Sequence, residues 1–435
     1  MSESIGPGRL RQGAIYRDGI SGVRPKVPTS WPAHVARAES RMSREGAAYI
    51  TGGAGSESTI ANNRNGFDEW QIVPRVLRDV SRRDLSVELL GRILPAPLLL
   101  APVGVSSMAH SEADVGAAKA AAAQGVPMVF SNQASRSMEE CAAVMGDSPR
   151  WFQLYWSTVD DLVESFIRRA EACGCEALVV TLDTTMLGWR SRDLDLGSLP
   201  FAHGWGIAQY TSDPVFQALV AERIRTGRSS PRTTEDRPKV SVAAIRTLMD
   251  IARAHPGSTR DNLRSPVPRA AVQTFLDIYS RPSITWADLA WLRARTNLPI
   301  VLKGILHPDD ARLAVDHGVD GLIVSTHGGR QVDGSIGAVQ ALPGVVEAVG
   351  GRVPVLMDSG VRSGADVFKA INLGADAVLI GRAWAYGLAI AGSNGVRDVI
   401  RNIIGELDLT MGLTGCASLG DVRGATLRRR EHGSD

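Results

Sequence analysis

Short runs of apolar residues recur along this chain, each followed by turn residues and then by a longer, alanine-rich segment. Runs of this length, bounded by turns, are typical of parallel strands that are buried on both faces. Eight of them stand at residues 97–104, 127–132, 150–155, 177–183, 299–305, 321–328, 353–360 and 377–383. The segments between them carry helical periodicity, as in 309–318, where Gly318 suits a helix C-cap. Eight alternations of strand and helix predict an α/β fold, the (β/α)8 TIM barrel.

One interval, from about 186 to 298, is too long for a single helix. It holds the polar stretch 225–238, and loops of this length in compact domains are usually lids or disordered segments. The chain is predicted to return to the barrel through an amphipathic helix at 283–296, with Thr285 as its N-cap. We therefore expect one catalytic barrel over residues 46–425, with a lid-like insertion at 186–298 after the fourth strand.

The two ends are predicted to lie outside the barrel. Residues 1–45 are rich in Gly, Pro, Ser and Arg, and an N-terminal helical arm that wraps loosely on the surface is expected. The glycines between residues 47 and 70 predict a tight, closely packed loop that follows Tyr49. Residues 426–435, with three consecutive arginines at 428–430, are expected to form a solvated C-terminal tail.

Composition and charge narrow the class of protein. The chain has 48 basic and 46 acidic residues, a net charge of +2, so neither nucleic acid nor an anionic membrane is expected as a partner. Four scattered cysteines fit neither a disulfide scaffold nor a metal site, and buried reduced thiols are expected. No apolar segment approaches the roughly 20 residues that span a bilayer, and the start lacks a secretory signal. A cytoplasmic enzyme without a metal is the expectation.

If the barrel forms, the polar residues at the strand ends meet at its carboxyl mouth, where barrel enzymes carry their sites. These residues are Ser131, Gln153, Tyr155, Thr181, Asp183, Lys303, Ser325, His327, Arg330, Asp358 and Arg382. Glycine-flanked arginines, Arg362 after Gly360 and Arg382 after Gly381, follow the last two strands, the usual phosphate site of such barrels. The alternative reading is glycine turns with surface arginines, but the pair at consecutive strands favours a phosphorylated cofactor.

Six motifs carry a resemblance to a known family: QLY at 153–155, TLDTTMLGWRSRD at 181–193, LKGI at 302–305, STHGGRQ at 325–331, DSGVR at 358–362 and IGR at 380–382. Over residues 45–425 the chain resembles the FMN-dependent α-hydroxy acid oxidases and dehydrogenases. Within that family, GGAGSE and the 181–193 motif look most like the lactate 2-monooxygenase branch. The resemblance implies FMN as cofactor, a small 2-hydroxy acid as substrate, oxygen as acceptor, and a homotetramer or homo-octamer.

The resemblance also implies roles for individual residues. His327 corresponds to the base that takes a proton from the substrate, and Asp183 to the carboxylate that holds its imidazole. Arg330, Arg190 and Tyr49 correspond to groups that bind the substrate carboxylate, and Tyr155 to the donor for the substrate hydroxyl. Lys303 corresponds to the lysine beside the flavin pyrimidine edge, and Trp189 lies near the expected pocket. The remaining positions that match the FMN site are Ala101, Pro102, Ser131, Gln153, Thr181, Ser325, Asp358, Gly360, Arg362, Gly381 and Arg382.

The chain departs from the family at two places. Thr326 replaces the usual asparagine before the histidine, which removes an amide donor. Met186 and Leu187 do not match an aromatic pair of lactate 2-monooxygenase, so a larger substrate is an alternative. Three readings follow: oxidation of a small L-2-hydroxy acid, with or without oxidative decarboxylation; biosynthetic oxidation of a larger hydroxy acid or an amine; and a scaffold that only binds a phosphorylated ligand.

Overall fold

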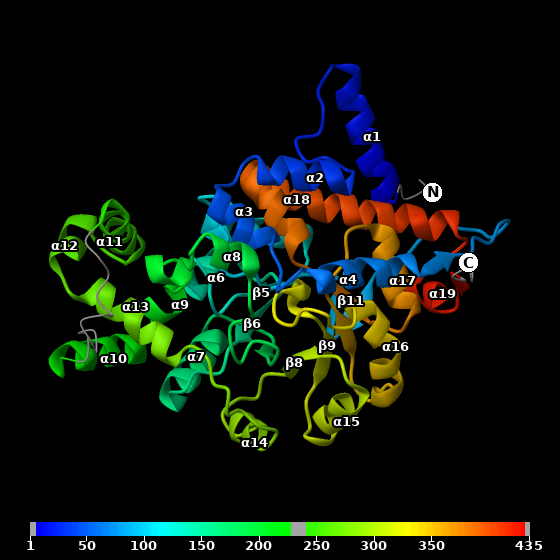
Figure 1. The fold of residues 1–435 in the computed structure, drawn as a ribbon. Coiled ribbons are helices and arrows are strands. Elements are labelled where there is room, and N and C mark those ends of the chain that lie inside the picture. The colour runs from blue at the N-terminus through cyan, green and yellow to red at the C-terminus, as the bar shows by residue number, and fades with distance from the viewer. Residues whose placement is uncertain (1–5, 228–240, 431–435) are drawn as a thin grey trace.

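The computed structural model describes residues 6–227 and 241–430. Its centre is a closed barrel of eight parallel strands, in the order β10-β11-β4-β5-β6-β7-β8-β9 (Figure 1). The strands are β4 (Leu98–Leu100), β5 (Met128–Phe130), β6 (Arg150–Leu154), β7 (Leu178–Thr181), β8 (Ile300–Ile305), β9 (Gly321–Val324), β10 (Val355–Met357) and β11 (Ala377–Ile380). Each lies within one of the eight predicted runs, so the predicted (β/α)8 barrel is confirmed.

A ring of helices surrounds the barrel, one after each strand or after the insertion. These are α5 (Ala113–Gln124), α6 (Met138–Met145), α7 (Asp160–Ala172), α14 (Asp288–Arg293), α15 (Pro308–Asp316), α16 (Ala338–Val349), α17 (Gly364–Asn372) and α18 (Arg382–Leu413). The strands are almost entirely buried because their outer faces pack on these helices and their inner faces on one another. The hairpin of β2 (Val87–Leu89) and β3 (Arg92–Leu94) adds Leu89 and Leu94 to the inner cluster.

The insertion between β7 and β8 is a helical body rather than a loose lid. Its described residues form α8 (Ser191–Asp195), η2 (Pro200–His203), α9 (Ala208–Thr211), α10 (Pro214–Arg225), α11 (Val242–Ala254), α12 (Thr259–Arg264) and α13 (Val267–Ile278). Phe201, Tyr210, Phe216 and Phe275 are fully buried and pack edge-to-face or tilted on one another. Most of the polar stretch 225–238 lies outside the described residues. The return helix is shorter than predicted: Thr285 donates to the Asp288 side chain at the start of α14.

The ends of the chain are more ordered than the sequence indicated. The N-terminal arm forms α1 (Pro7–Ile20), which projects from the barrel, and α2 (Trp31–Glu39), which packs along α18 (Figure 1). The predicted tight loop of residues 47–70 is mostly helical, in α3 (Arg44–Thr51) and α4 (Ser58–Asp68). The predicted tail begins as a strand, since β12 (Leu427–Arg429) pairs antiparallel with β1 (Trp70–Ile72), just after α19 (Leu419–Arg423).

No helix in the described ranges is long and apolar enough to cross a membrane. Cys141, Cys175 and Cys416 are buried, Cys173 is half-buried, and all four are free thiols, as predicted.

Candidate active site

A cavity of about 300 Å³ opens at the carboxyl ends of the barrel strands. Fourteen of the residues predicted from the sequence line it: Tyr49, Ala101, Pro102, Gln153, Tyr155, Arg190, Lys303, His327, Arg330, Asp358, Gly360, Arg362, Gly381 and Arg382. Ser131, Thr181, Asp183 and Ser325 stand behind this layer and contact its members. The strand-end residues therefore meet as the fold requires.

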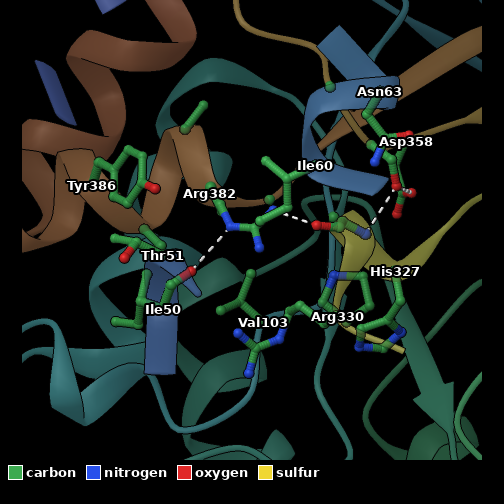
Figure 2. A pocket seen from close by; sticks show the side chains of 18 of the residues that line it. Ile50, Thr51, Ile60, Asn63, Val103, His327, Arg330, Asp358, Arg382 and Tyr386 are labelled. Atoms are coloured by element: carbon green, nitrogen blue, oxygen red, sulfur yellow. Dashed lines mark hydrogen bonds between the residues drawn. The ribbon is translucent and has the colours of Figure 1, made fainter. Parts of the chain in front are cut away.

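One end of the cavity gathers two arginines. Arg382 opens α18 and is held by three backbone carbonyls: Nε donates to Ile50 at 3.1 Å, Nη1 to Gly328 at 2.7 Å and Nη2 to Gly52 at 2.8 Å. In Figure 2 it lies between Ile50 and the loop that carries His327 and Arg330. Within the described chain, neither Arg362 nor Arg382 has a carboxylate at ion-pairing distance. Burial lowers the pKa of both guanidinium groups, and an anionic ligand at this end would supply the counter-charge that buried cations need.

Lys303 lies in the wall of the barrel and is 3% exposed. Its Nζ donates to Ser325 Oγ at 2.8 Å and pairs with Asp358 Oδ2 at 3.1 Å. A register shift in β8 between Lys303 and Ile305 aims the lysine at the cavity, as bulges near active sites commonly do. Burial alone would lower the pKa of Lys303, but the Asp358 and Asp183 carboxylates outweigh it and raise that pKa. Lys303 therefore stays protonated and positively charged at neutral pH.

His327 and Asp183 form a buried pair. His327 Nδ1 lies 2.8 Å from Asp183 Oδ1, which also accepts a hydrogen bond from Thr184 at 2.8 Å. Burial would raise the pKa of Asp183, but His327 and Lys303 lower it to about 2. Because the ionised carboxylate only accepts, Nδ1 carries the imidazole proton and Nε2 keeps its lone pair. His327 lines the cavity with a free basic nitrogen.

The loop that carries His327 has an unusual backbone. His327, Gly328 and Gly329 have φ values of 55°, 66° and 75°, so three successive residues adopt the left-handed region. That conformation is costly for histidine and free for glycine, which accounts for the two glycines in the motif. Ser359 Oγ stabilises the loop by accepting from the backbone N–H of Thr326 at 3.2 Å and of Gly328 at 3.0 Å. A strained residue held by its neighbours is characteristic of functional sites.

The cavity also holds Arg190, Arg330, Tyr49 and Tyr155. Arg330 lies close to Arg382, since both guanidinium groups donate to the Gly52 carbonyl. The Arg330 guanidinium lies 4.7 Å from the Tyr49 ring centroid and donates to the carbonyls of Tyr49 and Gly52. Arg190 donates to Gln331 Oε1 at 3.0 Å and lies 5.9 Å from the same ring. Burial, with Arg190 close by, lowers the pKa of Arg330 to about 9. Burial raises the pKa of Tyr155, so its phenol stays a hydrogen-bond donor at neutral pH.

Comparison with known proteins agrees with this geometry. Residues 38–429 match the model of a family described as FMN-dependent dehydrogenase. The chain belongs to the FMN-dependent dehydrogenase family. It is 42% identical to an L-lactate oxidase of Lysinibacillus sphaericus (strain C3-41) over 88% of each chain. It is 39% identical to the FMN-dependent alpha-hydroxy acid dehydrogenase qulF of Penicillium citrinum, over 98% of this chain and 96% of that one.

Solved structures give the same result. A mandelate oxidase with (S)-4-hydroxymandelic acid superposes with a TM-score of 0.75 at 33% identity, covering 92% of this chain and 99% of that one. Another mandelate oxidase structure, with a TM-score of 0.73 and 32% identity over 92% and 99% of the two chains, carries a C4a-OH-FMN adduct. Relatives are named as oxidases or dehydrogenases of 2-hydroxy acids, and two predictions are confirmed: FMN as cofactor and oxidation of a 2-hydroxy acid.

The residues of the cavity fit FMN. Among the described residues, no carboxylate pairs with Arg362 or Arg382, which suits a phosphate dianion, and Gly360 and Gly381 lie near them in the chain. A Cβ on Gly381 would meet Ala101 and Val103 at 3.8 Å, an ordinary van der Waals contact, so no protein atom crowds the backbone there. Gln153 donates to Thr181 at 3.1 Å and accepts from Ser131 at 3.3 Å, which fixes a buried amide beside Ala101 and Pro102 for the ring.

The structure does not bring Trp189 to the cavity. Its side chain is 74% exposed, and Met186 and Leu187 beside it are exposed as well. The argument for a larger substrate from Met186 and Leu187 therefore loses its basis, since neither residue lines the cavity.

Several residues at the site escaped sequence reasoning. Thr184, Gln331 and Ser359 lie inside the quoted motifs, so adjacency to Asp183, Arg330 and Asp358 could have found them. Adjacency could also have found Arg192, inside the 181–193 motif, and Gln133, directly after the run 127–132. Others come from distant segments and line the cavity without any strand-end signal: Trp31, Val35, Glu39, Thr51, Glu57, Ile60, Asn63 and Tyr386.

Asn63 is the hydrogen-bond partner of Thr326, the residue that stands where the family usually has asparagine. Its Nδ2 donates to Thr326 Oγ1 at 2.8 Å, and its Oδ1 accepts from Ala338 N at 3.0 Å. Asn63 is 2% exposed, so its amide depends on these partners.

Replacing Thr326 with valine is expected to destabilise the protein by about 1–3 kcal/mol, because the Asn63 amide loses its acceptor in a buried site. Denaturant unfolding of the apoprotein measures this effect. Thr326→Ser keeps the hydroxyl and should stay within about 1 kcal/mol of the parent. Equal stability of the valine variant and the parent would contradict a structural role for the pair.

Proposed function

We propose that this enzyme oxidises a short-chain L-2-hydroxy acid to the 2-oxo acid and passes the electrons to oxygen. The proposal rests on one observation: a base and a pair of arginines that can bind a carboxylate line the same cavity. A basic nitrogen on His327 faces the same space as Arg190 and Arg330, two cations placed for a carboxylate.

In this proposal His327 Nε2 takes a proton from the substrate while the Cα–H bond is oxidised. Asp183 stabilises the imidazolium that forms, through the bond to Nδ1. Asp183 stays ionised throughout, since its pKa is held at about 2. The pair keeps one tautomer and one ring orientation before the substrate arrives.

Arg330 and Arg190 bind the substrate carboxylate, and the hydroxyl of Tyr49 donates to the same group. A planar guanidinium can pair with both oxygens at once, which fixes the orientation of the carbon that reacts. Tyr155 donates to the substrate hydroxyl and to the negative charge that develops on its oxygen. Trp189 has no part in this arrangement.

FMN, when bound, accepts the two electrons that leave the substrate. Lys303 keeps its charge at the wall of the FMN site, where it stabilises the negative charge of the reduced state. In the resting protein the Asp358 carboxylate balances the positive charge of Lys303 through the 3.1 Å pair.

The bulky side chains that line the cavity near the arginines favour a substrate with a short side chain. Tyr49 and Tyr155 are each 6% exposed, and Val103 lines the same cavity. Relatives include L-lactate oxidases from three bacteria, and also a 4-hydroxymandelate oxidase. Lactate is therefore the first substrate to test. Oxidation of a larger hydroxy acid or an amine is the alternative, whereas a binding scaffold has no use for the His327–Asp183 pair.

Oxidative decarboxylation is a second candidate, favoured by the likeness of the GGAGSE and 181–193 motifs to lactate 2-monooxygenase. In it, pyruvate and hydrogen peroxide react before release and give acetate, carbon dioxide and water. A homotetramer or homo-octamer and a cytoplasmic location stay predictions from the family resemblance.

Anaerobic mixing with lactate, glycolate, mandelate and the corresponding amines tests the proposal. A hydroxy acid should bleach the flavin absorbance within seconds. When oxygen is admitted, a 2-oxo acid plus peroxide indicates an oxidase, and acetate without peroxide indicates the monooxygenase. Bleaching by amines alone, or reoxidation by a dye but not by oxygen, would overturn it.

The pH dependence of kcat/KM reports the state of His327. Burial lowers its pKa below 6.5 more than Asp183 raises it. Because protonation removes the base, kcat/KM should stay level from about pH 8 to pH 6.5 and fall only at more acidic pH. Steady-state rates across about pH 5 to 8 measure this profile. A decline that begins above pH 7 would contradict a lowered pKa.

A further inference from the structure

The helix α2 of the N-terminal arm forms part of the cofactor cavity. Trp31, Val35 and Glu39 line that cavity, and their spacing of four residues places them on one face of the helix. The match to the FMN-dependent dehydrogenase family begins at residue 38. Trp31 and Val35 therefore lie before the segment that the family model matches.

Trp31 contacts one of the two phosphate-site arginines. The Arg362 guanidinium lies 5.0 Å from the Trp31 ring centroid, within the range of a cation–π interaction. The indole is itself fixed, since the Tyr386 ring lies 5.6 Å away and the His34 ring 5.9 Å away, edge-on. Burial lowers the pKa of His34 to about 4, so His34 adds no charge that would compete for the ring.

The two arginines are held in different ways. Arg382 is fixed by three backbone carbonyls, whereas no hydrogen bond or ion pair of the Arg362 side chain is found in the described ranges. Arg64 stands near Arg362 and repels it, and Asp366, which attracts it, is already paired with Arg64 at 2.9 Å. The indole face is therefore the contact that sets where the Arg362 guanidinium lies.

We propose that Trp31 is a positioning residue for FMN. It holds Arg362 at the phosphate end of the cavity, and α2 covers that end. Trp31 touches no reacting atom, so it acts on retention of the cofactor and not on the chemical step. The inference rests on FMN as cofactor and is independent of the substrate and the acceptor.

Binding of FMN and of riboflavin to the apoprotein tests the proposal, read from the quenching of flavin fluorescence without any substrate. Riboflavin lacks the phosphate and serves as the internal control. Trp31→Leu, which keeps apolar bulk and removes the ring, should raise the Kd for FMN about 3- to 30-fold and leave that for riboflavin within about twofold. Trp31→Phe should restore most of the affinity, and Val35→Ala, on the same helix face, should change both ligands alike.

A double-mutant cycle with Arg362→Gln completes the test. Once Arg362 is absent, Trp31→Leu should cause no further loss of FMN affinity. An equal loss of affinity for FMN and riboflavin, or additive effects in the cycle, would mean that Trp31 only covers the cavity and does not position Arg362. If Trp31→Leu does not fold, fluorinated tryptophans at position 31 keep the shape and weaken the ring face. The Kd for FMN should then rise with each fluorine, and a flat series would overturn the proposal.

Discussion

Replacing His327 with alanine should leave the protein yellow with bound FMN and slow anaerobic flavin reduction about 10²- to 10⁴-fold. General base catalysis contributes an effect of this size, and within the described cavity lining no other neutral imidazole is present. Stopped-flow absorbance of the flavin at saturating hydroxy acid measures the rate. The flavin content of the purified variant shows whether the cofactor site survives.

Asp183→Asn is the matched control. It preserves the shape of the pair but replaces the charge that stabilises the imidazolium, and its amide can donate where the carboxylate only accepts. We expect a loss of reduction rate that approaches that of His327→Ala, and little further loss in the double variant, since the two residues act as one unit. Additive losses, or reduction at the parental rate in either variant, would refute the base assignment.

The barrel could be predicted because its signal is local. Each strand buries both faces, so the run of apolar residues is visible without knowing its neighbours, and the pairing order follows the chain. The helices of the insertion and of the N-terminal arm could not be predicted from local patterns of this kind. These helices are short, and they are stabilised by tertiary contacts, such as those of Phe201 and Phe275, that no local period reveals.

The residues of the site divide in the same way, into those that local sequence patterns predict and those that only tertiary contacts bring in. His327, Asp183, Lys303 and Arg382 stand at strand ends, so the fold itself brings them together. Asn63 could not be predicted, because it meets Thr326 from 263 positions away in the sequence.

The prediction that Trp189 lies at the pocket was wrong for a related reason. Trp189 adjoins Arg190, but the irregular loop before α8 has no period that tells inward from outward residues. The backbone at Gly188 passes so close to the carbonyl of Arg330 that a Cβ there would clash at 2.6 Å. The Trp189 side chain is left in solvent.

The buried charge of Arg330 destabilises the folded apoprotein but strengthens the binding of an anionic ligand. Within the described residues Arg330 has no carboxylate at ion-pairing distance, and burial, with Arg190 close by, lowers its pKa to about 9. A buried cation of this kind disfavours the folded apoprotein relative to a neutral side chain. The same desolvation strengthens its attraction for an anionic ligand, because little water competes for the guanidinium. The cation is therefore best explained by what it binds.

Arg330→Met tests this explanation by comparing the binding of a charged ligand with that of an uncharged one. The Kd for a 2-hydroxy acid should rise about 30-fold or more, because a buried charge-assisted contact is lost. The Kd for the corresponding 2-hydroxy amide, which has no charge, should change less than about threefold. The melting temperature should stay within about 3 °C, since relief of the buried charge offsets the lost bonds to Tyr49 and Gly52. The dependence of the anaerobic flavin reduction rate on acid concentration gives the constant for the acid, and titration of the flavin spectrum gives that for the amide.

The control for removing an arginine near the cavity is Arg192→Met. Arg192 also lines the cavity, but its guanidinium is already paired with the Glu57 carboxylate at 2.5 Å, so it has less charge to offer a ligand. Its loss should therefore leave the Kd for the acid and for the amide within about threefold of the parent, since a half-exposed pair contributes little. Equal losses for acid and amide in Arg330→Met would mean that Arg330 holds the loop and not the carboxylate.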